Sequence, residues 1–169
     1  EEKTIMRTIS LSLEYDESYV IRYESNTGEK VDVSIPAMLS NTYTDGAGEI
    51  VLGTPVKTVT GFAGRIDLKS IILPATATAI GNAAFKDCTG LYRIDIPDGV
   101  KSIDDYAFAG CDRLVEIRFG SGLTRIGSNA FEGCTGFTSF EIPDHVTSIG
   151  GYLFKDCSDD MELTVSYDL

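Results

Sequence analysis

The apolar and polar positions of the chain repeat with a period of 23 residues. Four full units follow one another without insertion, at residues 68–90, 91–113, 114–136 and 137–159. Each unit carries an isoleucine, a phenylalanine and a cysteine at fixed places: Ile80, Ile103, Ile126 and Ile149; Phe85, Phe108, Phe131 and Phe154; Cys88, Cys111, Cys134 and Cys157. No single unit can bury its own apolar face, so the period predicts a solenoid whose coils stack to build a shared core.

The residues within one unit predict its local structure. Residues 91–96 end in alternating apolar and polar positions, which is typical of a strand with one buried face. Pro97 suits the end of that strand because proline lacks the donor that a strand ladder needs. Residues 100–103 predict a short second strand, and the spacing within residues 107–111 is that of a helical or 3₁₀ turn with its apolar side inward. Gly110 fits a position of positive φ in that turn, although an aspartate replaces it in two other units.

Partial units flank the four full ones. Residues 47–67 follow the same pattern, but they are two residues short and lack the cysteine. Residues 160–169 carry the start of a further strand. We therefore predict a solenoid over residues 47–169, made of one degenerate repeat, four full repeats and a terminal strand.

The N-terminal residues 1–46 break the period and predict a separate element. Residues 5–15 alternate apolar and polar positions, and residues 19–23 and 31–35 are rich in the same strand-forming residue types. A turn signal at residues 25–28 separates the last two segments. We interpret residues 1–46 as a small antiparallel β meander that caps the solenoid.

The unit pattern I-x-I-P-x-x-V-x-x-I-G-x-x-A-F-x-x-C resembles the BspA-like, or treponemal-type, leucine-rich repeat. The resemblance covers residues 47–169, and it departs from the pattern at Gly120 in place of proline, Asp104 in place of glycine and Leu153 in place of alanine. It implies a fold of leucine-rich-repeat-type coils, each with a strand, a short second strand and a helical or 3₁₀ turn. It also implies an extracellular or cell-surface protein of bacteria that binds proteins of a host or of neighbouring cells.

The exposed face of the main sheet is the candidate partner-binding face, because the surfaces of solenoids serve as extended binding sites. Its side chains are those that alternate with the buried ones, and the residues we single out are Arg93, Asp95, Glu116, Arg118, Glu141, Val51 and Ile72. With neighbouring strands about 4.8 Å apart, Arg93 is expected beside Glu116, and Arg118 between Asp95 and Glu141. Such exposed pairs of opposite charge largely satisfy one another, each with a contribution of roughly 0–1 kcal/mol.

Two apolar residues, Val51 and Ile72, are expected side by side on this otherwise polar face. A cover formed by residues 1–46 would explain them, and so would a partner site. The pattern of the sequence leaves both explanations open.

The charge balance limits the partners. The chain has 14 Lys and Arg against 26 Asp and Glu, a formal net charge of −12. This sign argues against nucleic acid and anionic membrane surfaces, and it favours a partner with a basic patch. No apolar run approaches the roughly 18 residues of a membrane-spanning helix, so no direct membrane insertion is expected.

The sequence offers little to catalysis or to cofactors. Four cysteines in one column spread over roughly 14 Å at about 4.8 Å a step, whereas one zinc ion needs all its ligands at about 2.3 Å. Disulfides between neighbouring coils are also unfavourable at that spacing, so we interpret the column as buried free thiols. The single histidine, His145, falls in a turn where other units have Thr or Gly. We expect no catalytic, cofactor or metal site.

These observations favour a non-catalytic, monomeric protein-binding module of the cell surface or of secreted proteins, with an extracellular protein as its partner. The alternative is a structural spacer, or a fragment of a longer surface repeat array with no ligand of its own.

Overall fold

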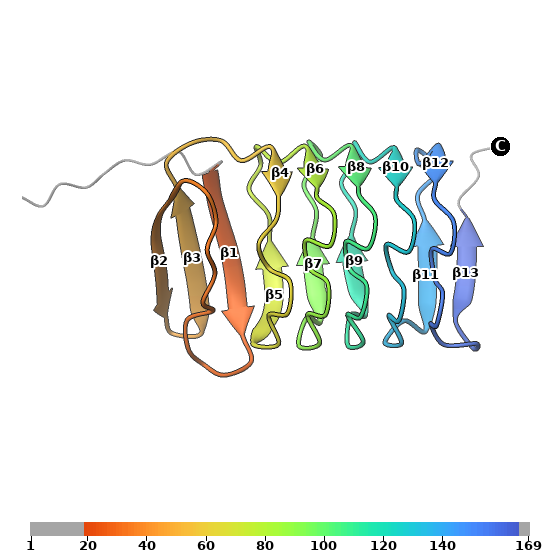
Figure 1. Cartoon of the computed structure of the whole chain (residues 1–169), viewed down its shortest axis with the longest axis horizontal. Coiled ribbons are helices and arrows are strands. Elements are labelled where there is room, and N and C mark those ends of the chain that lie inside the picture. Colours follow the sequence, from red (N-terminus) through yellow and green to blue (C-terminus); the bar gives the residue numbers. More distant parts are fainter. Residues whose placement is uncertain (1–18, 166–169) are drawn as a thin grey trace, which may run out of the picture.

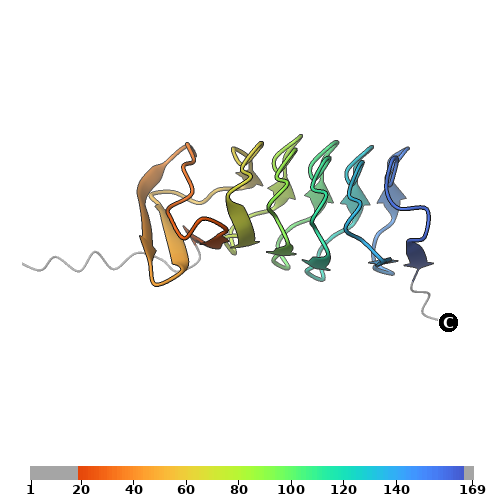
Figure 2. The same cartoon turned by 90° about the horizontal axis from the view of Figure 1, so that it is seen from below.

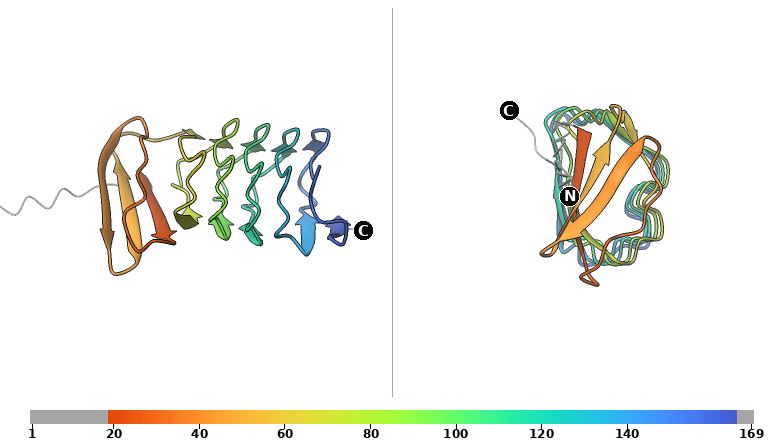
Figure 3. Two further views of the ribbon diagram at one scale, coloured as in Figure 1. Left: turned by 60° about the horizontal axis from the view of Figure 1, so that its bottom comes forward. Right: turned by 90° about the vertical axis from the view of Figure 1, so that its left-hand side faces the viewer.

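Residues 19–165, which the computed structural model describes, form a stack of coils with an antiparallel sheet at its N-terminal end (Figure 1). Viewed along the stack, successive coils overlie one another, so equivalent residues lie in columns (Figure 3). The regular elements are short strands joined by tight turns. The predicted repeat solenoid of leucine-rich-repeat-type coils is confirmed.

The first strand of each coil lies along one side of the stack. These strands are β5 (Leu68–Ile72), β7 (Arg93–Asp95), β9 (Glu116–Arg118), β11 (Ser139–Ile142) and β13 (Glu162–Val165). β5, β7 and β9 are parallel, with Ile71 opposite Ile94 and Ile94 opposite Ile117. Paired residues are therefore one period apart, as the sequence predicts. β11 pairs with β13 in a separate two-stranded sheet.

A second sheet runs along another side without a break. Its parallel strands are β4 (Thr58–Val59), β6 (Ala79–Ile80), β8 (Ser102–Ile103), β10 (Arg125–Ile126) and β12 (Ser148–Ile149). The predicted second strand of each unit is thus present in every coil. The two sides and the connecting turns are visible from below in Figure 2.

The third side is made of tight turns that also bond from coil to coil. The backbone N–H of Phe85 donates to the carbonyl of Ala107 at 2.8 Å, and that of Phe108 donates to Ala130 at the same distance. The φ angle is positive at Gly110 and Gly133 and at the aspartates that replace them, as the turn analysis predicts. Positive φ also occurs at a second column that the sequence does not reveal: Ala83, Tyr106, Asn129 and Tyr152.

A column of phenylalanines fills the interior behind these turns. Phe62, Phe85, Phe108 and Phe131 are fully buried, and their rings stack with centroids 5.1, 5.3 and 5.4 Å apart. Phe154 continues the column at 5.9 Å from Phe131 and is partly buried. The stack therefore has one continuous core.

The cap is antiparallel, but its strand order differs from a meander. It contains β1 (Val20–Ser25), β2 (Met38–Thr44) and β3 (Ala47–Leu52), in the spatial order β2-β3-β1, and β1 then pairs antiparallel with β5. β3, placed by the sequence analysis in the degenerate repeat, pairs antiparallel with β1 and β2 instead of stacking on β5. The strand predicted at residues 5–15 lies outside the described residues.

The prediction of a strand at residues 31–35 is wrong. Val31, Val33 and Ile35 are buried, as their alternation predicts, but this segment pairs with no strand of the described chain. It runs past the first coil, where the carbonyl of Ser34 lies 3.3 Å from the Cβ position of Gly61. The alternation therefore reports burial against the end of the stack and not membership of a sheet.

One side chain fastens the cap to the solenoid. The Asn26 amide donates to the carbonyls of Ile66 and Leu68 at 3.3 Å and of Gly90 at 3.2 Å. The backbone N–H of Asn26 donates to the carbonyl of Asp67 at 2.7 Å. The turn after β1 is thereby fixed to the first two coils.

Candidate functional site

The exposed face of β5, β7 and β9 carries a compact cluster of four charged side chains. Arg93 and Asp95 flank the buried Ile94 on β7, and Glu116 and Arg118 flank the partly buried Ile117 on β9, so all four point to the same side. Strand register places Arg93 opposite Glu116 and Asp95 opposite Arg118. The 23-residue period predicts both neighbours.

The strongest ion pairs of this cluster lie within a strand. Arg93 holds both carboxylate oxygens of Asp95, with its Nη2 at 2.9 Å from Oδ2 and 3.2 Å from Oδ1. The Nε of Arg118 lies 3.0 Å from Glu116 Oε1. Across the strands, Arg93 to Glu116 and Arg118 to Asp95 each measure 3.9 Å. The pKa of Arg93 is raised above its ordinary value, mainly by the hydrogen bond to Asp95. The cluster is therefore internally neutralised.

A hollow lies on the cap side of this cluster. It has a volume of about 380 Å³, and its lining includes Glu24, Lys69, Ile72, Tyr92 and Glu116. Ile72 and Tyr92 are 48% and 52% exposed, and Lys69 pairs with Glu24 at 3.0 Å. This hollow thus combines exposed apolar surface with polar side chains.

The parallel sheet is interrupted on the other side of the cluster. Within residues 19–165, β9 pairs with β7 alone and β11 with β13 alone. Figure 1 shows the interval between β9 and β11 as wider than that between β7 and β9. The second sheet stays continuous behind it, because β8, β10 and β12 remain paired.

Three phenylalanines occupy the interruption. Phe119, Phe137 and Phe140 stand where the preceding coil has the smaller Ile96, Leu114 and Ile117. Phe140 meets Phe119, Phe137 and Phe154 edge-on, at centroid distances of 5.8, 5.0 and 4.7 Å. Inserting larger side chains into a packed layer forces backbone to move. We attribute the separation of β11 from β9 to these rings.

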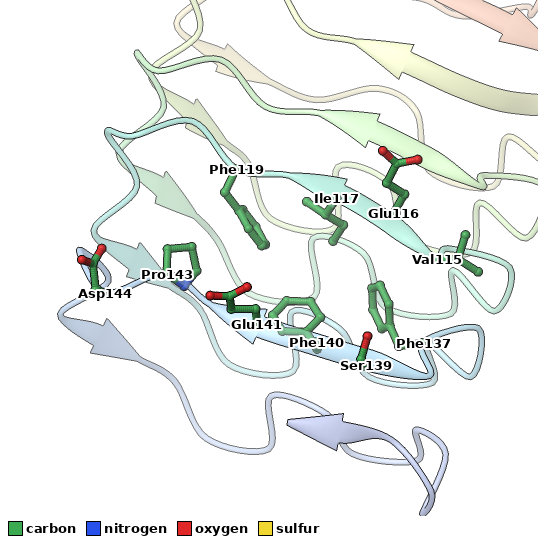
Figure 4. A pocket seen from close by; sticks show the side chains of 10 residues that line it. All are labelled: Val115, Glu116, Ile117, Phe119, Phe137, Ser139, Phe140, Glu141, Pro143 and Asp144. Atoms are coloured by element: carbon green, nitrogen blue, oxygen red, sulfur yellow. The ribbon is translucent and has the colours of Figure 1, made fainter. Parts of the chain in front are cut away.

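The separation leaves a groove on the sheet side of the molecule (Figure 4). Its volume is about 550 Å³, and it is lined by Val115, Glu116, Ile117, Phe119, Phe137, Ser139, Phe140, Glu141, Pro143 and Asp144. Ile117 and Phe119 are partly exposed there, whereas Ile94 and Ile96 in the coil before them are buried. The lining contains three carboxylates and no Lys, Arg or His.

The predicted site residues do not all meet. β1 lies between β3 and β5, so Val51 and Ile72 are not neighbours: Val51 lies opposite Val20, and Ile72 opposite Arg22. Val51 is buried at 9% exposure, whereas Ile72 remains half-exposed. The expected place of Arg118 beside Glu141 is also wrong, since β9 and β11 do not pair and Glu141 lies across the groove.

Sequence reasoning missed the groove. Its only signal in the sequence is the run of phenylalanines at core positions where other units have Leu or Ile. Replacing Leu or Ile by Phe keeps a position apolar. The repeat pattern of apolar and polar residues therefore does not reveal the groove.

The cysteine column consists of free thiols. The Sγ of Cys88, Cys111, Cys134 and Cys157 donates to a phenylalanine carbonyl of the coil before, at 2.9, 3.1, 3.2 and 3.1 Å. The pKa values of Cys134 and Cys157 are raised, mainly because burial disfavours the charged thiolate. Among residues 19–165, no group of three or more His, Cys, Asp or Glu is placed to hold a metal ion.

His145 lies in the turn between β11 and β12. Its side chain is one-third exposed, at 33%, and its Nδ1 lies 3.1 Å from Asp144 Oδ1. Nothing in the described part of the chain is long and apolar enough, as a helix, to span a membrane.

Comparisons with known proteins agree with this architecture. A family described as BspA type leucine rich repeat region matches residues 59–166 in six copies. The crystal structure of a T. pallidum leucine-rich repeat protein (TpLRR) is similar with a TM-score of 0.59 and 37% identity, covering 62% of this chain and 50% of that chain. A Bacteroides ovatus leucine-rich repeat protein gives a TM-score of 0.59 and 36% identity, covering 79% of this chain and 32% of that chain.

The matched region thus spans at most half the length of either solved structure. A comparison with the sequences of curated proteins finds no match.

Proposed function

The chain belongs to the BspA type leucine-rich repeat family, and from this premise we propose that it is a non-catalytic protein-binding module of the cell surface or of secreted proteins. Its partner is an extracellular protein of a host or of a neighbouring cell. Its binding face is the sheet side of the stack, around Arg93, Asp95, Glu116, Arg118 and Glu141.

One observation carries this proposal: Glu116 lines both hollows of the sheet side. The hollow beside Ile72 and the groove beside Phe119 therefore adjoin one another across the charged cluster. Together they offer apolar surface and fixed charge on a rigid scaffold, and such a preorganised surface reduces the ordering cost of binding. The overall acidic balance favours a partner with a basic patch, which speeds association at low salt.

A charge-reversal experiment tests the proposal. The labelled chain is titrated onto cultured epithelial cells and onto cells of other bacteria, with and without prior protease treatment of the cells. We expect saturable binding that protease treatment abolishes and that the double variant Asp95→Lys/Glu141→Lys weakens at least tenfold. The matched control, Asp112→Lys/Asp159→Lys, changes net charge equally at exposed positions away from the sheet strands. Equal binding by both double variants would refute the proposed face.

The second candidate is a segment of a longer repeat array without a ligand of its own. It rests on the apolar side chains of the last described coil, since Ile149, Leu163 and Val165 are 47%, 50% and 43% exposed. Their equivalents one coil earlier, Ile126, Phe140 and Ile142, are buried at 0%, 5% and 5%. A further coil stacked on β12 and β13 would bury them. In that role the chain gives no saturable cell binding, and neither double variant has an effect.

A further inference from the structure

Two strand edges face the groove with their backbone ladders broken. In the intact part of the sheet, the N–H of Ile96 donates to the carbonyl of Arg118 at 2.8 Å, and the N–H of Val115 donates to Tyr92 at 3.1 Å. The equivalent N–H groups at the groove belong to Phe119 and Thr138. Within residues 19–165 neither of them makes a backbone hydrogen bond. Unpaired edges of this kind are templates for a strand from another chain.

The edges are parallel and their register is fixed. β11 runs parallel to β13, and both take the same direction in the stack as β7 and β9 (Figure 1). A strand placed between β9 and β11 would have one face toward Ile117, Phe119 and Phe140 and the other toward solvent. Strand alternation then requires apolar residues at every second position.

The charged side chains around the groove determine which residues an inserted strand should carry at its solvent-facing positions. Glu116 borders the first outward position, and Asp144 follows the last one, beyond the end of β11. Between them, the middle outward position lies between Arg118 and Glu141, and it suits an uncharged residue such as threonine. Glu116 is already bonded to Arg118 in its own strand, but the lining holds three carboxylates and no basic residue, and this excess of negative charge favours lysine or arginine at the two ends of the inserted segment.

We propose that the groove between β9 and β11 binds an extended basic segment of the partner protein, which adds as the missing strand with the pattern basic–apolar–Thr–apolar–basic. The segment restores the backbone bonds of Phe119 and Thr138, packs its two apolar residues on the phenylalanines, and pairs its basic ends with Glu116 and Asp144. This proposal rests on the proposed function, because it names the partner chemistry of the same sheet side.

The probe is the synthetic peptide acetyl-Lys-Val-Thr-Val-Lys-amide, titrated into the ¹⁵N-labelled chain and followed by NMR. We expect the amide signals of Phe119 and Thr138 to shift with one binding constant and to gain protection from hydrogen exchange. Two control peptides separate the contributions. Glutamate in place of both lysines should weaken binding at least tenfold, and so should N-methylation of both valines, which removes two backbone donors but keeps every charge.

A variant of the chain tests the groove itself. Phe119→Ile/Phe137→Leu/Phe140→Ile gives this layer the residue types of the intact coils and is expected to close the slot. Peptide binding should then be lost while the chain still melts cooperatively. If this variant fails to fold, Glu116→Gln and Asp144→Asn, which keep the phenylalanines, should each weaken the peptide threefold or more.

Four results would overturn the proposal. N-methylated and parent peptides of equal affinity would show adsorption by charge alone. Signals that shift elsewhere, with Phe119 and Thr138 unchanged, would exclude the groove. A chain that sediments as a dimer until the peptide is added would show that a second copy fills the slot. Cell binding that survives closure of the groove but is lost in Asp95→Lys/Glu141→Lys would reject this inference and leave the proposed function standing.

Discussion

The thiol of Cys111 donates to the carbonyl oxygen of Phe85 at 3.1 Å, one coil away. The same contact recurs at Cys88, Cys134 and Cys157. The carbonyl of Phe85 also accepts the backbone N–H of Cys88 at 3.2 Å, so the thiol of Cys111 adds a second hydrogen bond that links the turns of neighbouring coils. This bond gives the cysteine column a structural role, independent of metal or disulfide chemistry.

We expect the thiols to react slowly and in a definite order. Cys88, Cys111 and Cys134 are buried, whereas Cys157 in the last full coil is partly exposed. Burial also raises the pKa of Cys134 and Cys157, which lowers the fraction of reactive thiolate at neutral pH. Native iodoacetamide labelling followed by mass spectrometry should modify Cys157 first and the other three only after unfolding. Rapid native labelling of Cys111 would contradict the buried column.

The phenylalanine column should dominate stability in the interior coils. Phe108→Ala is expected to lower the free energy of unfolding by about 3–5 kcal/mol, because a fully buried ring leaves a cavity between two neighbours. Phe154→Ala should cost less, since Phe154 is only partly buried. Denaturant melts of both variants measure the difference, and equal losses would count against it.

Phe62 should behave as an interior residue. From the sequence it is expected to matter less, as a member of an end coil with a single neighbour. The structure shows it fully buried, with the segment Val31–Ile35 running past the same coil. We therefore expect the cost of Phe62→Ala to approach that of Phe108→Ala in the same denaturant melts.

Closing the groove should restore the sheet. In Phe119→Ile/Phe137→Leu/Phe140→Ile the smaller side chains allow β11 to approach β9 and pair with it. Hydrogen exchange at the amides of Phe119 and Thr138 should then slow at least tenfold, since each gains a carbonyl partner. The matched control is Phe85→Leu, which shortens a ring that stacks on Phe62 and Phe108 away from the groove and should leave both rates unchanged.

The contact of Asn26 should hold the cap in place. Asn26→Ala removes the donors to Ile66, Leu68 and Gly90, and a loss of about 1–2 kcal/mol of unfolding free energy is expected, because the carbonyls of Leu68 and Gly90 are partly buried and lose a partner. Thr27→Ala, one residue along in the same turn, is the control and should cost less, because the hydroxyl of Thr27 bonds within the turn, to Ser25 and Glu29. Similar losses in both variants would mean that Asn26 acts only on the local turn.

The ion pair of Glu132 with Lys155 should make the stability of the protein sensitive to acid, through the tight turns on the third side of the stack. The hydrogen bond from Lys155 lowers the pKa of Glu132 below its ordinary value of 4.5. A depressed carboxyl pKa adds stability above the unfolded-state pKa and loses it as pH falls through the folded-state value. Melting midpoints should therefore fall more steeply below about pH 4.5 for the wild type than for Glu132→Gln. Parallel pH profiles would show that the pair has no effect.

The register of the coils was predictable because equivalent residues recur at a fixed period of 23 residues. Ile71, Ile94 and Ile117 stand one period apart and lie opposite one another in the sheet. The cap was less predictable. Residues 47–52 match the repeat pattern, yet they follow Asp45-Gly46, a two-residue hairpin signal whose φ angles are both positive in the structure. The local turn decides the pairing of β3, and the apolar spacing alone does not reveal it.

The candidate site was predictable only in part, for a similar reason. The cluster of Arg93, Asp95, Glu116 and Arg118 follows from strand register, which the period determines. The groove depends on how Phe119, Phe137 and Phe140 fit one layer of the core. Ring shape and packing are not expressed in an apolar–polar pattern.

Strand β1, which runs antiparallel to β5, makes the two ends of the stack different. In the continuous second sheet, each strand from β4 to β12 pairs parallel with the strand of the next coil, so one coil presents the surface that the next coil covers. β1 runs against β5, and β2, at the far edge of the cap, belongs to no coil. Among residues 19–165, the coil strands at the end of the stack, open to a further coil, are β12 and β13. The stack is therefore polar, and an engineered array of these repeats would be lengthened by adding coils at the β12 and β13 end.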